Sequence, residues 1–145
     1  LLVQLRPPGL DEGLVVALER LVESFRLRSD TSLHFEAAAA CRLSPAAEAA
    51  LFRIVQEALG NAVKHAHARE IAVRLAAIDG TLEITVRDDG AGFDPAAPPE
   101  PASGRSGIGM RSMRERAAEV GAVLRIQSAP GAGTAVIVIA PAAGR

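Results

Sequence analysis

The sequence contains little of what several functional classes require. It has no tryptophan, no tyrosine and only four phenylalanines, so 3% of its 145 residues are aromatic. Proteins that hold single-stranded nucleic acid stack the bases on aromatic side chains, and this chain offers few. The formal net charge is −1, which gives no general attraction to nucleic acid or to an anionic membrane surface. We therefore expect this chain to contact neither nucleic acid nor membrane.

Cysteine and long apolar runs are also scarce. Cys41 is the single cysteine, which excludes a disulfide within the chain, argues against a thiolate zinc site and fits a reducing, cytoplasmic location. No apolar segment approaches the roughly 20 residues of a membrane-spanning helix, and no signal peptide is visible. Because the chain begins at Leu1 rather than at Met, we expect it to be part of a longer protein, whose membrane anchor, if it has one, lies elsewhere.

Aliphatic residues are what the sequence has in abundance. Apolar residues make up 49% of the chain and charged residues 23%, which is typical of a globular protein. A chain of this length predicts one domain that buries roughly 70% of its unfolded surface. With few aromatic residues, the core must consist of leucine, isoleucine, valine and alanine.

The periodicity of the apolar residues predicts an α+β fold. Helical spacing predicts helices over residues 11–25, 45–66 and 108–120. Alternation predicts strands over residues 32–38, 70–76, 82–87, 123–128 and 134–140. Residues 96–106, rich in proline, alanine, glycine and serine, predict a loop. This order predicts a two-layer α/β sandwich, with a mixed, mostly antiparallel sheet and its helices on one face.

Local signals mark the ends of these elements. Asp11 and Ser44 are expected N-caps, and Pro45 suits the first helical position. Asp79-Gly80 predicts a tight hairpin between two strands. Gly121 is expected just past the end of the third helix.

The second helix carries a row of polar side chains. Glu57, Asn61 and His65 recur every four residues, and Lys64 lies beside them, so all four share one helix face. An amide oxygen suits magnesium, a carboxylate can accept a proton, and an ammonium group can pair with phosphate. The alternative is a solvated helix face without chemistry.

Asp88-Asp89-Gly90-Ala91-Gly92-Phe93 follows the strand over residues 82–87. Asp and Gly are poor strand residues, but glycine lets the backbone approach a ligand closely. Asp88 could accept a hydrogen bond from an exocyclic amine such as that of adenine. The alternative is an acidic turn.

Two further glycine-containing segments follow along the chain. Gly107-Ile108-Gly109-Met110 leads into the third helix, whose first N–H groups could bind an anion. A loop rather than a strand precedes it, which excludes a dinucleotide fingerprint, and no P-loop motif is present. The segment 131–134, Gly-Ala-Gly-Thr, opens the last strand and is by itself a hairpin turn.

These four segments, in this order, resemble the ATP-binding domain shared by gyrase, the heat-shock chaperone of the ninety-kilodalton class, sensor histidine kinases and MutL. Residues 53–66 resemble the asparagine box, residues 88–93 and 107–110 the two glycine boxes, and residues 131–134 the terminal Gly-x-Gly-Thr. Residues 113–116, Met-Arg-Glu-Arg, and residues 5–8, Leu-Arg-Pro-Pro, are similar to the sensor histidine kinases related to nitrate/nitrite sensors. Asp89 departs from a frequent asparagine, and Met110 from a frequent leucine.

The resemblance implies a Bergerat-type ATPase fold and a role for each matching residue. It implies that Asn61 binds Mg²⁺, that Glu57, Asn61 and Lys64 take part in catalysis, and that Asp88 binds the adenine amine with support from Thr134. The remaining positions expected to contact ATP are Lys64, His65, Gly90, Gly92, Gly107, Ile108, Gly109 and Met110.

By the same resemblance, residues 1–10 are the end of a dimerisation helix and its junction, and residues 11–145 form the catalytic domain. Its partners would be the parent's own dimerisation and phosphoacceptor domain and a downstream response regulator. Neither His34 nor His67 is expected to be the phosphoacceptor, which would lie outside this chain. Two alternatives stay open: an anti-sigma-factor-type serine kinase and a non-catalytic nucleotide-sensing module.

Overall fold

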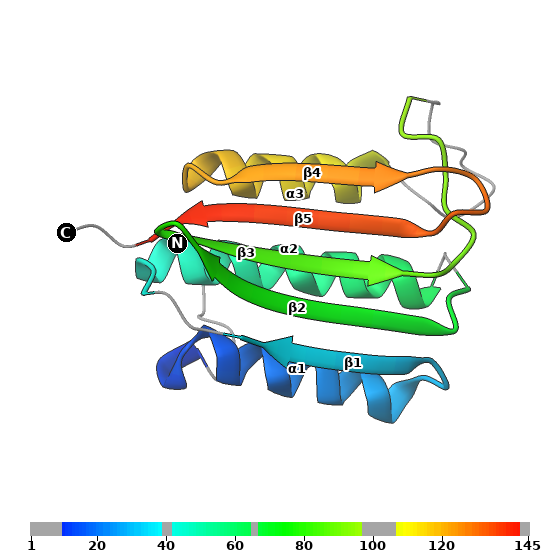
Figure 1. The fold of residues 1–145 in the computed structure, drawn as a ribbon, viewed down its shortest axis with the longest axis horizontal. Coiled ribbons are helices and arrows are strands. Elements are labelled where there is room, and N and C mark those ends of the chain that lie inside the picture. The colour runs from blue at the N-terminus through cyan, green and yellow to red at the C-terminus, as the bar shows by residue number, and fades with distance from the viewer. Residues whose placement is uncertain (1–9, 39–41, 65–66, 97–106, 143–145) are drawn as a thin grey trace, which may run out of the picture.

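The computed structural model describes residues 10–38, 42–64, 67–96 and 107–142 (Figure 1). Its elements are η1 (Leu10–Glu12), α1 (Leu14–Arg28), β1 (Ser32–Ala37), α2 (Pro45–Lys64), β2 (Glu70–Ile78), β3 (Thr81–Asp88), α3 (Gly107–Glu119), β4 (Val123–Ser128) and β5 (Thr134–Pro141). The predicted helices and strands are confirmed, with bounds that differ by a few residues. The loop predicted over residues 96–106 lies almost wholly outside the described residues.

The five strands form one mixed sheet in the order β1-β2-β3-β5-β4. β1 and β2 are parallel, and the other three pairs are antiparallel. The β2–β3 connection is the predicted two-residue turn, in which Asp79 and Gly80 both have positive φ, 50° and 77°. Positive φ at both central positions favours a type I′ hairpin, which matches the twist of the strands. The predicted fold class is confirmed.

The three helices cover one face of the sheet, which lies in front of them in Figure 1. α1 packs on β1, α2 on β3 and β5, and α3 on β4. Between the two layers lies an aliphatic core whose largest fully buried members are Leu18, Leu51, Ile54, Leu59, Ile71, Leu75, Leu82 and Ile84. Burying one such side chain contributes about 1.5–3 kcal/mol, so the core holds the helices firmly against the sheet.

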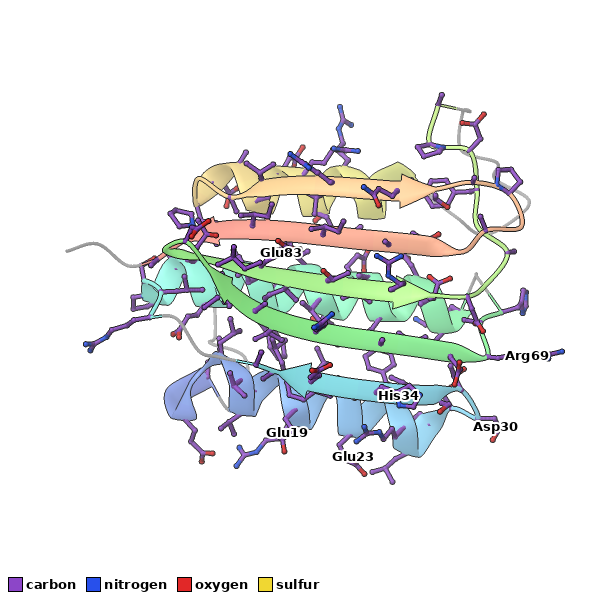
Figure 2. The ribbon with its side chains drawn as sticks, in the orientation of Figure 1. Glu19, Glu23, Asp30, His34, Arg69 and Glu83 are labelled. Carbon is purple, nitrogen blue, oxygen red and sulfur yellow. The ribbon has the colours of Figure 1, made fainter. Side chains whose placement is uncertain are left out.

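The opposite face of the sheet carries polar side chains. Glu83 of β3 and His34 of β1 both lie on this face (Figure 2). His34 is exposed and lies 3.6 Å from the carboxylate of Glu70. This placement confirms the interpretation of His34 as a surface residue.

The helix ends show which local signals the fold uses. The Ser44 Oγ accepts a hydrogen bond from the Ala47 N–H at 3.1 Å, as an N-cap does. Gly121, at φ 69°, ends α3 in a Schellman arrangement, with its own N–H donating to the Ala118 carbonyl oxygen. The prediction that Asp11 caps the first helix is wrong. Asp11 belongs to η1, and the N-cap of α1 is Gly13, which has no side chain to form a cap hydrogen bond.

The chain directions bring four segments to one edge of the sheet, on the right in Figure 1. β3 and β4 end there, and β2 and β5 begin there. The last turn of α2 and the first turn of α3 lie at the same edge (Figure 1). Among the described residues, no helix is both long and apolar enough to cross a membrane.

Candidate functional site

A cavity opens at this edge, between the sheet, α2 and α3. It is lined by Ala58, Asn61, Ala62, Val86, Asp88, Phe93, Met110, Met113, Ile126, Thr134 and Val136. Most of the lining is apolar, and three polar side chains, those of Asn61, Asp88 and Thr134, stand among it. A largely apolar cavity with a few convergent polar groups is typical of a small-molecule site.

Asp88, Thr134 and Ser128 form one row across the sheet. Asp88 of β3 pairs with Thr134 of β5, and Thr134 pairs with Ser128 of β4. Residues directly opposite one another on neighbouring strands point to the same face of the sheet. All three side chains therefore point toward the helices, and two of them reach the cavity.

Asp88 is the buried polar residue of the described chain, with 9% of its surface exposed. The Gly90 N–H donates to its Oδ1 at 2.8 Å. This local hydrogen bond fixes the carboxylate where β3 ends. An ionised carboxylate has only acceptor positions, so Asp88 suits a ligand that presents an N–H group.

The segment that follows Asp88 is in close backbone contact with the β4–β5 turn, and glycines make this contact possible. Gly92 has φ 67°, and a Cβ at this position would collide with the Ala129 carbonyl oxygen. Gly133 has φ 73°, and a Cβ there would collide with the carbonyl oxygen of Asp88. The Gly131 N–H donates to the Ala91 carbonyl oxygen at 2.6 Å. Glycine is required at both positions because two backbones touch there.

Asp89 lies outside the cavity and has a different role from Asp88. Its Oδ1 accepts hydrogen bonds from the N–H groups of Arg69, at 2.8 Å, and Glu70, at 3.0 Å. The hydrogen bonds from Glu70 and Arg69 lower the pKa of Asp89 below its ordinary value of 3.8. Asp89 thereby ties the end of β3 to the start of β2, the end at which Arg69 is seen in Figure 2.

The polar face of α2 reaches the site through its last two turns. Asn61 is half-buried and lines the cavity. Glu57 lies one turn earlier on the same helix and is half-buried, and Lys64 is exposed at the end of α2. Thus Asn61 lies at the cavity itself, and Glu57 and Lys64 flank it along the helix. His65 lies outside the described residues.

The second glycine segment forms the first turn of α3. Gly107, Ile108 and Gly109 begin the helix, and Met110 lines the cavity. Met113, one turn further on, is 1% exposed and also lines the cavity. The first N–H groups of α3 are thereby placed beside the cavity, where a helix N-terminus favours an anion.

Most of the apolar lining and one polar residue near the cavity were not predicted from the sequence. Phe93, Met113 and Ile126 line the cavity but were not among the predicted site residues. Strand parity could have identified Ile126, because it alternates with Arg125 and Gln127 and therefore lies on the apolar face of its strand. Ser128 itself was missed because a lone serine at a strand end carries no signal of its own.

The donor set fits a magnesium ion that is bound mainly through a nucleotide. Among the described residues, no group of three His, Cys, Asp or Glu side chains is placed to hold a metal ion. Mg²⁺ commonly uses one or two protein oxygens together with substrate phosphates and water. The amide oxygen of Asn61, with Glu57 one turn away, provides that kind of set.

Known proteins share both the sequence and the fold of this chain. Residues 46–144 match the family model of the histidine kinase-, DNA gyrase B- and HSP90-like ATPases. The sensor histidine kinase MctS of Rhizobium johnstonii is 40% identical over 94% of this chain and 30% of its own length. The sensor histidine kinase LiaS of Bacillus subtilis is 35% identical over 97% of this chain and 38% of its own length. The chain thus spans about a third of these curated relatives.

Solved histidine kinases have the same fold. The histidine kinase domain of the blue-light-activated kinase EL346 from Erythrobacter litoralis superimposes with a TM-score of 0.73 at 24% identity, over 89% of this chain and 61% of that one. Full-length ShkA gives a TM-score of 0.74 at 23% identity, over all of this chain and 32% of that one. The chain belongs to the histidine kinase-, DNA gyrase B- and HSP90-like ATPases, and within that family it is an ATP-binding catalytic domain of the sensor histidine kinase type.

Proposed function

We propose that this domain binds ATP together with Mg²⁺ in the cavity between α2, α3 and the sheet, and delivers the γ-phosphate to a histidine on a separate helical domain. The observation that carries the proposal is the convergence of Asn61, Asp88 and Thr134 on one apolar cavity beside the N-terminus of α3. These groups come from the three segments that resemble nucleotide-binding motifs. The sensor histidine kinases among the relatives favour histidine as the acceptor.

The base would occupy the apolar part of the cavity. Asp88, fixed by the Gly90 N–H, would accept a hydrogen bond from the adenine amine. Ala58 and Ala62 of α2 are buried and small, so they leave room for a flat ring opposite Val86 and Val136 of the sheet. Recognition would thus combine apolar contact on the ring faces with one directed hydrogen bond.

The phosphates would lie between the end of α2 and the start of α3. The first N–H groups of α3, around Gly107 and Gly109, are suited to phosphate oxygens, and Lys64, with His65, would supply positive charge. Asn61 would hold Mg²⁺, which neutralises charge on the phosphate oxygens. Phosphoryl transfer depends mostly on positioning and charge neutralisation, and these groups would provide both.

Glu57 would assist the acceptor. The acceptor histidine nitrogen forms a bond to the γ-phosphorus, the bond between that phosphorus and the bridging oxygen breaks, and ADP leaves. A carboxylate beside the acceptor can take the ring N–H proton. Glu57, one turn from Asn61 on the same helix face, is the residue we assign to this role.

Residues 1–10 would join this domain to the dimerisation and phosphoacceptor helices, and a response regulator would receive the phosphoryl group afterwards. We place the domain in the cytoplasm, where two-component signalling uses ATP, with an anchor in the parent where one exists.

A phosphotransfer assay tests the proposal against its two alternatives. The chain is mixed with γ-labelled ATP, Mg²⁺ and the helical phosphoacceptor segment of its parent. We expect label on that segment that is acid-labile and base-stable, as phosphohistidine is, and no label when Mg²⁺ is left out. Label on serine would contradict the proposal in favour of an anti-sigma-factor-type kinase. ATP binding without any transfer would favour a nucleotide-sensing module.

A further inference from the structure

We propose that Ser128 is a positioning residue that gives the site its preference for adenine, by fixing the direction of the Thr134 hydroxyl. This inference rests on the proposed function and adds to it a residue that does not line the base cavity. Ser128 is half-buried at the last position of β4, on the far side of Thr134 from Asp88. Its influence on the nucleotide would therefore pass through its neighbours.

One hydroxyl group makes three hydrogen bonds at this position. The Phe93 N–H donates to Ser128 Oγ at 2.9 Å. Ser128 Oγ donates to the Gly133 carbonyl oxygen at 3.0 Å. The Oγ1 of Thr134 lies 2.8 Å from the same oxygen, a distance at which either hydroxyl could donate. Ser128 thus contacts the segment after β3, the β4–β5 turn and Thr134 together.

Counting protons assigns the direction of the third bond. A serine hydroxyl has one proton and two acceptor positions. The Phe93 N–H occupies one acceptor position, and the proton goes to the Gly133 carbonyl oxygen. The remaining acceptor position takes the proton of Thr134, so all three bonds are satisfied when Thr134 donates to Ser128. The oxygen of Thr134 then has only acceptor positions left for the cavity.

The consequence is a cavity wall that accepts hydrogen bonds and donates none. Thr134 and Asp88 lie opposite each other and both line the cavity. An exocyclic amine has two N–H groups and suits two neighbouring acceptors. A carbonyl oxygen at the same position of the base, as in inosine, would face acceptors only. No hydrogen bond could then form between the base and these two side chains, and leaving buried acceptors without a donor weakens binding.

The backbone around Ser128 keeps this arrangement in place. The collisions that a Cβ would cause at Gly92 and Gly133 show that the segment after β3 and the β4–β5 turn are in direct backbone contact. Phe93, whose N–H is held by Ser128, itself lines the cavity. Loss of the Ser128 hydroxyl would remove this hydrogen bond of the Phe93 N–H and free the Thr134 proton to point toward the base.

Titration calorimetry with two nucleotides tests the inference on the full chain. ATP and inosine triphosphate differ at the exocyclic position of the base and share their phosphates. For Ser128→Ala we expect ATP binding to weaken about tenfold, the factor of about one lost hydrogen bond, and inosine triphosphate binding to weaken less. The ATP preference should therefore shrink. Ser128→Thr keeps the hydroxyl and should restore the preference to within about threefold.

A serine elsewhere provides the matched control. Ser24 in α1 donates to the Leu21 carbonyl oxygen at 2.7 Å, and Ser24→Ala should leave both affinities unchanged. If Ser128→Ala weakens both nucleotides equally, its hydroxyl supports only the fold and the inference is overturned. If the unmutated chain binds neither nucleotide, the proposed function fails first and the inference fails with it.

Discussion

Asp88 and Asp89 are adjacent carboxylates with different surroundings and different tasks. Asp88 points toward the helices and lines the cavity, with its Oδ1 held by the Gly90 N–H. Asp89 points away and holds the N–H groups of Arg69 and Glu70. The alternation of side chains along a strand end separates the two. At the scale of single residues, one carboxylate lines the cavity and its neighbour holds the backbone of the scaffold.

The lowered pKa of Asp89 predicts how acid affects stability. A carboxyl group with a lowered pKa in the folded state stabilises the protein above its unfolded-state pKa and loses that contribution as the pH falls through the folded-state value. For Asp89 this window begins near the ordinary value of 3.8 and extends below it. The free energy of unfolding of the natural chain should therefore fall more steeply below about pH 4 than that of Asp89→Asn.

Urea unfolding at a series of pH values measures this difference. Asparagine keeps an oxygen that can accept both N–H groups and does not titrate, so near pH 7 its effect should be small. Asp89→Ala removes the acceptor and should destabilise the chain at every pH above the window. Parallel pH profiles for the natural chain and Asp89→Asn would show that Asp89 has no such coupling.

At the scale of elements, the spacing of apolar residues predicted the helices and strands, because each element buries one face. The alternation in β2 and β3 and the apolar face of α2 predicted these elements because their buried residues form the core. The cap of α1 could not be predicted in this way. Asp11 is a good capping residue by type, but a short 3-10 helix at Leu10–Glu12 places Gly13 at the cap. Which residue caps the helix therefore depends on packing between segments, and not on the residue types of one segment alone.

The residues of the candidate site likewise differ in whether the sequence alone predicts them. Residues with a chemical signature, such as Asn61, Asp88 and Thr134, could be predicted and line one cavity. The apolar lining and Ser128 could not, because their roles arise from strand pairing between segments far apart in the chain. The register that places Ser128 beside Thr134, and Thr134 beside Asp88, exists only in the folded sheet.

The β4–β5 turn offers a matched pair of glycines with which to test its backbone contact with the end of β3. Gly131 and Gly133 both have positive φ, 79° and 73°, but a Cβ on Gly131 meets open space and one on Gly133 collides with Asp88. Gly131→Ala should cost about 1–2 kcal/mol, the cost of the left-handed conformation. Gly133→Ala should cost more than about 3 kcal/mol, because backbone must also move.

Chemical denaturation of the two variants gives these free energies of unfolding directly. The Gly133 variant should also bind ATP more weakly, because the backbone that must move carries Asp88. Equal destabilisation by the two substitutions would contradict the close contact between the turn and the end of β3.

At the scale of the whole molecule, the topology explains why the site lies where it does. β3 and β4 end, and β2 and β5 begin, at the edge where α2 ends and α3 begins (Figure 1). Segments separated by up to 77 residues in the chain, from Glu57 to Thr134, are thereby brought to one place. Residues on the core side supply the apolar cavity, and residues at the element ends supply its polar groups.

Isothermal titration calorimetry of ATP with the natural chain and with Asp88→Asn tests the central claim most directly. Asparagine keeps the size of Asp88 but replaces one acceptor oxygen with an N–H donor, which would face the adenine amine. Asp94→Asn, at an exposed position beyond the same glycine segment, serves as the control. We predict that the natural chain and Asp94→Asn bind ATP with the same affinity and that Asp88→Asn shows no detectable binding. An unchanged affinity in Asp88→Asn would contradict the assignment of this cavity as the ATP site.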